Sequence, residues 1–110
     1  MASQKPRPTK GKSAPAEPTS GWTFLTNHAH VLICIAEDSN ARIRDLAQRA
    51  GITERAVQKI ITDLEVGGYL THLREGRRNV YRVRANQPLR HPVEHHRDVS
   101  TLIALVLGRR

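Results

Sequence analysis

Basic, amide and hydroxyl side chains recur at helical spacing along residues 53–66. At 100° per residue, Arg55, Gln58, Lys59 and Thr62 share one face of such a helix. The opposite face carries only branched apolar residues: Val57, Ile60, Ile61 and Leu64. Arg and Lys can reach guanine acceptors, Gln can pair with adenine, and Thr can contact a thymine methyl group. The polar face therefore has the chemistry to read base edges in a major groove, although an ordinary solvated helix face would have similar residues.

A second cluster of basic residues follows closely in the sequence. Arg74, Arg77 and Arg78 surround Gly76 and Asn79, in a segment with the composition of a hairpin tip. Such a tip suits a phosphate backbone or a minor groove, whereas the plainer interpretation is that its charges keep edge strands soluble. The two basic clusters together favour contact with DNA.

Other chemistry finds less support. No nucleophile with a base, no phosphate-binding glycine loop and no carboxylate pair stands out, so we expect neither an enzyme nor a cofactor. Histidines raise the question of a metal site: His28, His30, His91, His95 and His96. On a helix, His95 and His96 would point about 100° apart, and His91 precedes a proline. We therefore expect surface histidines and no metal site.

Length and charge agree with a small polyanion-binding protein. The chain of 110 residues suits one compact domain with tails, and it carries a formal net charge of +8. Basic residues outnumber acidic ones in each of the ranges 1–21, 22–84 and 85–110, so the excess is not confined to a tail. The longest apolar run, 102–107, is too short to span a membrane, and residues 5–10 lack the apolar stretch of a secretory signal. We expect a cytoplasmic protein in which the single cysteine, Cys34, is a buried apolar side chain.

The helices and strands that position the polar clusters can be predicted from the periodicity of apolar residues and from the residues that begin or end each element. Residues 1–21 are predicted to be a disordered basic tail, because Pro, Lys, Ser and Thr dominate them. A first helix starts near Leu25, with Thr26 as its cap and one apolar stripe formed by Ala29, Leu32, Ile33 and Ala36. Residues 41–43 leave room for a very short strand before a second helix at 45–50.

Gly51 ends that second helix and suits a turn with positive φ. Thr53 caps the third helix, which runs to about Val66 and stops at Gly67. Hairpin strands are predicted over 69–74 and 80–84. After an irregular connector, helical spacing returns from Val99.

The segments 45–53 (DLAQRAGIT), 61–70 (ITDLEVGGYL) and 77–81 (RRNVY) resemble winged helix-turn-helix regulators of the MarR or ArsR type. The resemblance covers residues 25–84. It implies transcriptional control by a homodimer, with residues 53–62 in the major groove and a wing over 74–79 at the backbone or minor groove. The chain is shorter than typical MarR proteins and lacks the cysteine pairs of many ArsR metal sensors. The resemblance therefore does not indicate a metal or a small-molecule effector for this chain.

The last helix has more apolar surface than one stripe can hide. We expect it to pack in a homodimer next to the first helix, through Val99, Leu102, Ile103 and Val106. The alternative is that it folds back on its own domain.

The expected fold is therefore mainly α with a small β-hairpin: a winged helix-turn-helix domain over 22–84, followed by a connector and a C-terminal dimerisation helix over 85–110. The expected partner is double-stranded DNA, and the expected contacts are Thr53, Glu54, Arg55, Gln58, Lys59, Thr62, Arg74, Arg77, Arg78 and Asn79. A winged-helix module for protein contacts is the main alternative. RNA is a weaker one, because stacking aromatic residues are scarce.

Overall fold

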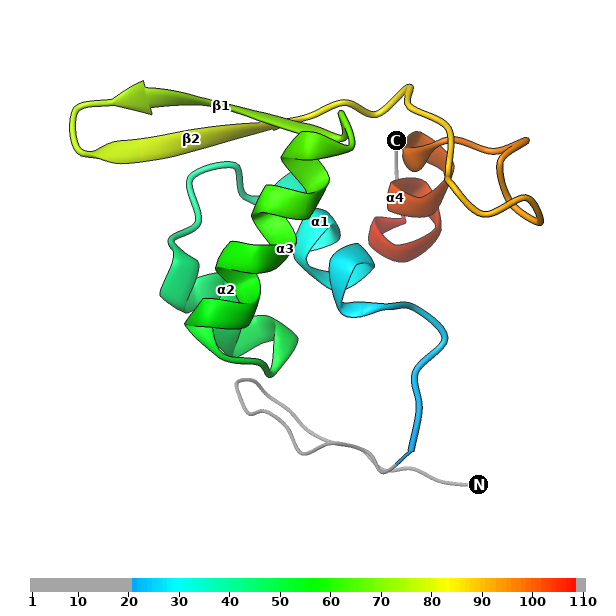
Figure 1. Cartoon of the computed structure of the whole chain (residues 1–110), viewed down its shortest axis with the longest axis horizontal. Helices are drawn as coiled ribbons and strands as arrows, with labels where there is room; N and C mark the ends of the chain where they lie inside the picture. Colours follow the sequence, from blue (N-terminus) through cyan, green and yellow to red (C-terminus); the bar gives the residue numbers. More distant parts are fainter. Residues whose placement is uncertain (1–20, 109–110) are drawn as a thin grey trace.

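The computed structural model describes residues 21–108, in which four helices and one antiparallel hairpin follow one another along the chain (Figure 1). The elements are α1 (Asn27–Glu37), α2 (Ile43–Ala50), α3 (Glu54–Val66), β1 (Leu70–Glu75), β2 (Arg78–Val83) and α4 (Val99–Leu107). The fold is thus a small mixed one, with helices and a hairpin as the sequence predicted. The predicted basic tail lies outside the described residues except for Gly21.

Helix α1 forms the centre of the molecule. It packs against α2, α3, β2 and α4, and every residue from Val31 to Ile35 is buried. The sequence predicted a single apolar stripe that included Ala29 and Ala36, but these two alanines are only half-buried. The prediction was too narrow because a helix covered from several sides is apolar nearly all round.

Local signals in the sequence set the bounds of three helices. The hydroxyl oxygens of Thr26 and Thr53 accept hydrogen bonds from the backbone N–H groups of Ala29 at 3.1 Å and Ala56 at 3.0 Å, which confirms both predicted N-caps. Gly51 has a φ of 74°, as predicted for the turn that follows α2. The buried residues of α3 are the four predicted from its periodicity.

The predicted short strand at 41–43 does not form. Instead, α2 begins at Ile43, two residues earlier than expected. The Asp45 carboxylate reaches back to the backbone N–H of Arg42 at 3.3 Å, and this contact favours the first helical turn. Only one backbone bond joins the preceding loop to the hairpin, from the N–H of Tyr81 to the carbonyl of Ser39 at 3.1 Å. A single bond does not make a strand.

Strands β1 and β2 pair from Leu70↔Val83 to Glu75↔Arg78, so the turn between them consists of Gly76 and Arg77 alone. Gly76 takes a φ of 64°, which glycine allows without steric cost. The hairpin was predicted correctly, but its turn is tighter than the expected one. In Figure 1 the hairpin extends to one side of α3, over the loop between α1 and α2.

Helix α4 lies on the other side of α1 from the hairpin tip (Figure 1). The connector before it is held at its base by backbone bonds from Val99 N–H to the Gln87 carbonyl at 3.0 Å and from Ser100 N–H to the Ala85 carbonyl at 2.9 Å. Val99 is only 1% exposed and belongs to the core of the single chain. Its side chain therefore has almost no surface left for the predicted dimer interface, because it is already buried within one chain.

The remaining predicted interface residues differ in exposure. Ile103 packs against the core, Leu102 is half-buried and Val106 is 47% exposed. The alternative prediction was that the last helix folds back on its own domain. It explains why the side chains along one edge of α4 are buried.

Cys34 is buried in α1, and this burial raises the pKa of its thiol. None of the helices in residues 21–108 combines the length and the apolar character needed to cross a membrane.

Candidate nucleic-acid interface

The polar face of α3 is open to solvent along its whole length. Its N-terminal residues, Thr53 and Glu54, are exposed. The four predicted base-contacting side chains are exposed as well: Arg55, Gln58, Lys59 and Thr62. The opposite face holds the helix on the core through Val57 and Ile60. The apolar face of α3 thus holds the helix on the core, and its polar face remains accessible to a partner.

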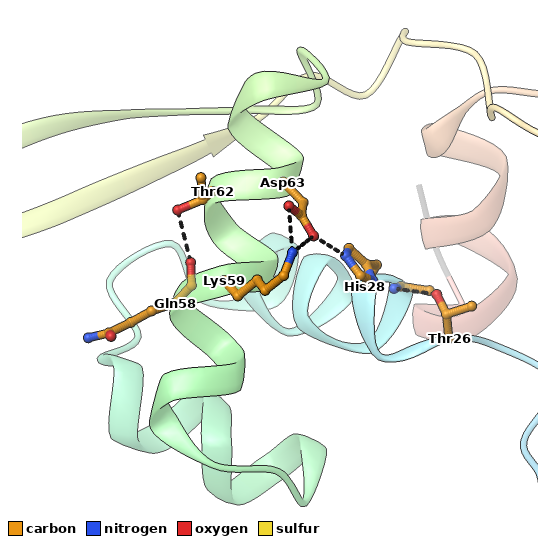
Figure 2. Close-up of polar contacts among 7 residues, drawn as sticks. Thr26, His28, Gln58, Lys59, Thr62 and Asp63 are labelled. Atoms are coloured by element: carbon orange, nitrogen blue, oxygen red, sulfur yellow. Dashed lines mark hydrogen bonds and ion pairs between the residues drawn. The ribbon is translucent and has the colours of Figure 1, made fainter.

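Gln58 and Thr62 lie one turn apart on this face. Gln58 is exposed, and Figure 2 shows its amide pointing away from α1. The Thr62 hydroxyl donates a hydrogen bond to the backbone carbonyl of Gln58 at 3.1 Å. Because that hydroxyl is engaged, Thr62 offers its methyl group to a partner, which suits a thymine methyl.

Lys59 takes part in a contact network that sequence reasoning missed. Its Nζ lies 3.3 Å from both carboxylate oxygens of Asp63, and Asp63 also meets the His28 Nε2 of α1 at 2.8 Å (Figure 2). The contacts with His28 and Lys59 lower the pKa of the Asp63 carboxyl below its ordinary value. The four-residue spacing of Lys59 and Asp63 could have indicated their pairing. No local signal points to His28, which is 35 residues away from Asp63.

This network has two consequences for the polar face. Asp63 joins the polar side of α3 to α1, and it partly neutralises Lys59. A phosphate approaching Lys59 must therefore compete with a carboxylate that is already in contact.

The hairpin residues predicted to contact DNA fall into three environments. Arg77 in the turn is exposed, and no hydrogen bond or ion pair holds its side chain within the described part of the chain. The Nε of Arg74 donates to the Gly76 carbonyl at 3.3 Å. Arg78 donates to the carbonyl of Asn40, so its guanidinium also holds the hairpin against the preceding loop. Of these three arginines, only Arg77 in the turn has a side chain that makes no such contact within the described residues.

Asn79 was predicted as a DNA contact, but it is half-buried on the side of the hairpin shared with Tyr81. Its Oδ1 is buried and has no hydrogen-bond partner among the described residues. The one-residue alternation of a strand explains the difference, since Arg78 and Asn79 must point to opposite faces.

A side-chain contact joins α3 to β1. His72 Nδ1 lies 2.5 Å from Glu65 Oε2, across the turn formed by Gly67 and Gly68. This contact, together with that of Arg78, links both strands to the helical part of the fold.

The histidines that suggested a metal site do not converge. Within residues 21–108, no group of three or more His, Cys, Asp or Glu side chains is arranged to hold a metal ion.

What the described residues bring together is an exposed polar helix face and an arginine-bearing hairpin, in consecutive elements joined by a tight turn. No model of a known protein family matches the chain, and a search of curated proteins finds no match either.

Proposed function

We propose that the chain is a winged helix-turn-helix protein that binds double-stranded DNA and acts as a small transcriptional regulator. The observation that carries the proposal is the exposed face of α3, where Arg55, Gln58 and Thr62 stand opposite a fully apolar buried face. The arginines of the adjoining hairpin supply the positive charge that a phosphate backbone attracts.

In this function α3 enters the major groove and the hairpin acts as the wing. Arg55 and Gln58 are the base-reading residues, because each can make a bidentate contact with a purine edge. Arg77 and Arg74 contact the backbone or minor groove and add affinity without sequence preference. The His28–Asp63 contact holds α3 against α1, and the Glu65–His72 contact holds the wing against α3. Both contacts thereby position the residues that meet DNA.

A second candidate, a winged-helix module for protein contacts, is favoured by one observation. Leu73 on β1 and Val66 at the end of α3 are large apolar side chains that remain exposed. Exposed apolar residues mark protein interfaces when they are contiguous. The basic hairpin and the polar face of α3 favour DNA over this alternative.

The test is a selection of bound duplexes from a random DNA library, followed by titration of the enriched duplex at two salt concentrations. We expect one enriched motif and an affinity that falls steeply with salt, because bound phosphates release counterions. Folded protein that enriches no motif and binds no duplex at low salt would favour the protein-contact module.

A further inference from the structure

Three titratable side chains meet where α3 lies against the first turn of α1. The imidazole Nε2 of His28 lies 2.8 Å from the Oδ2 of Asp63, and the Nζ of Lys59 lies 3.3 Å from the same oxygen (Figure 2). One carboxylate is therefore shared between a lysine of its own helix and a histidine of another. The DNA-binding function proposed above gives His28 no task beyond holding α3 against α1.

All three side chains are accessible to solvent. The exposed fraction of the side chain is 48% for His28, 38% for Asp63 and 75% for Lys59. A proton can therefore reach the imidazole, and a phosphate can approach the ammonium group. Lys59 also belongs to the exposed polar face of α3, so a change in charge at this cluster acts directly on the surface proposed to meet DNA.

Only His28 changes its charge near neutral pH. The contacts with His28 and Lys59 lower the pKa of the Asp63 carboxyl, so this carboxyl is ionised above about pH 5. Histidine is the side chain whose ordinary titration falls between about pH 5 and pH 8. An imidazole with a proton on Nε2 can donate to a carboxylate in its neutral and in its charged form. The contact can thus persist while the net charge of the three side chains rises from zero to one.

No other charged side chain in residues 21–108 lies within hydrogen-bond or ion-pair distance of His28. Helix α4 carries no charged residue. In α2, Arg49 pairs at 2.7 Å with Glu37, which lies nine residues after His28 and about 13 Å further along α1. In β2, Arg78 donates to the loop after α1, and Arg82 lines the same surface hollow as Glu37. The imidazole therefore responds chiefly to the two side chains of α3.

We propose that, in the DNA-binding function set out above, His28 makes the affinity for DNA depend on pH by controlling how strongly Asp63 holds Lys59. When the imidazole is neutral, Lys59 alone balances the carboxylate and its ammonium group is retained there. When the imidazole carries a proton, two cations share one carboxylate, and Lys59 is released to a backbone phosphate. DNA is then bound more tightly as the pH falls. His28 is a positioning residue in this scheme, because it acts through Lys59.

The expected effect is modest and measurable. An exposed ion pair such as that of Lys59 with Asp63 changes an equilibrium by roughly 1.4-fold to 5-fold, so the release of Lys59 should strengthen binding by this factor in each protomer. Lys59 also gains a phosphate contact, so the slope of log K against log salt should become steeper by up to about 0.9 at low pH. The remaining histidines gain charge as well, and their contribution has to be separated from that of His28.

The first experiment measures duplex binding by fluorescence anisotropy at about pH 5.5 and about pH 8, at one ionic strength, which brackets the ordinary titration of histidine. His28→Gln keeps an amide that can donate to Asp63 but does not titrate. It should reduce the gain in affinity at low pH by roughly 1.4-fold to 5-fold. The matched control is His96→Gln, since His96 is also exposed but belongs to the connector before α4, and its gain should equal that of the unmodified protein. An equal gain in His28→Gln and in the unmodified protein would overturn the proposal.

Two further variants test whether the effect passes through Asp63 and Lys59. Asp63→Asn removes the charge that retains Lys59, so this variant should bind DNA more tightly than the unmodified protein at the higher pH. If Asp63 only held α3 against α1, its replacement would weaken binding at both pH values, and that result would refute the proposed coupling. Lys59→Gln should lose the steeper salt slope at the lower pH, whereas a slope that still steepens would assign the effect to another residue. Circular dichroism checks that each variant is folded.

The same titrations separate this coupling from the DNA-binding function itself. Folded, unmodified protein that binds no duplex at either pH would overturn the proposed function and the role of His28 together. Duplex binding with a dependence on pH that His28→Gln and Asp63→Asn leave unchanged would overturn the role of His28 alone.

Discussion

Replacing Arg77 with alanine should remove about one counterion from the salt dependence of DNA binding. Among the three hairpin arginines predicted to contact DNA, Arg77 is the one whose charge no protein group engages, because it lies in the two-residue turn and makes neither a hydrogen bond nor an ion pair within residues 21–108. Arg78 differs, since its guanidinium donates to the Asn40 carbonyl. Its replacement should loosen the hairpin as well as remove charge.

The size of the effect follows from the number of available basic side chains. Of the five basic side chains predicted to contact DNA, three make no contact with another element or with a carboxylate, Arg55, Arg74 and Arg77, while Lys59 and Arg78 are engaged. With a slope of about −0.9 per phosphate contact, one protomer should show a slope between roughly −2.7 and −4.5 in log K against log salt. A fourfold rise in salt then weakens binding by roughly 40-fold to 500-fold. Losing Arg77 lowers the slope by about 0.9, which reduces that loss roughly 3.5-fold.

The assay is fluorescence anisotropy of a labelled duplex, titrated at a series of salt concentrations. The matched control is Arg90→Ala, because Arg90 is also exposed but belongs to the connector before α4, and Figure 1 shows this connector on the other side of the molecule from the hairpin turn. We expect its slope to equal that of the unmodified protein. An unchanged slope for Arg77→Ala, or an equal decrease for Arg90→Ala, would show that the hairpin is not the phosphate-contacting element.

Three further predictions test base reading, the core and the α1–α3 contact. Gln58→Ala should relax preference at one base pair by about 1 to 3 kcal/mol, since its side chain is exposed and its amide can pair with adenine; library selection with the variant measures this. Leu46→Ala should lower the free energy of unfolding by about 2 to 5 kcal/mol, because Leu46 is fully buried between the helices; urea unfolding measures the loss. Asp63 has a folded pKa below its ordinary value, so its contacts stabilise the fold above the unfolded pKa, and this stabilisation is lost as the pH falls through the folded one. Asp63→Asn should therefore flatten the acid limb of a stability profile measured by urea unfolding between pH 6 and pH 3, and an acid limb as steep as that of the unmodified protein would contradict this assignment.

The helices were predictable where one residue type decides a boundary. Thr53 and Gly67 bracket α3 because a threonine cap and a glycine act within one turn of the chain. The buried and exposed faces of α3 followed from its 3.6-residue period for the same reason. The first helical turn of α2 was missed because the Asp45 contact with the Arg42 backbone competes with an extended segment, and periodicity alone does not weigh the two.

The parts of the site that depend on distant residues were not predictable. His28 reaches Asp63 only after α1 packs against α3, and Arg78 reaches Asn40 only after the hairpin folds over the loop. The same holds for Val99, whose apolar character fits a dimer interface and a monomer core equally well. Charged replacements at Leu102 and Ile103, two of the predicted interface residues, would therefore disturb the fold along with any interface, because Ile103 packs on the core.

The buried thiol of Cys34 makes this chain convenient for chemical labelling. Because a thiol reagent reacts with the thiolate, a buried cysteine with a raised pKa stays unmodified while the protein is folded. A second cysteine introduced on the surface, for example at Arg77, would thus take a dye selectively without the removal of Cys34. The rate at which Cys34 itself is slowly modified then reports how often the central helix α1 opens to solvent.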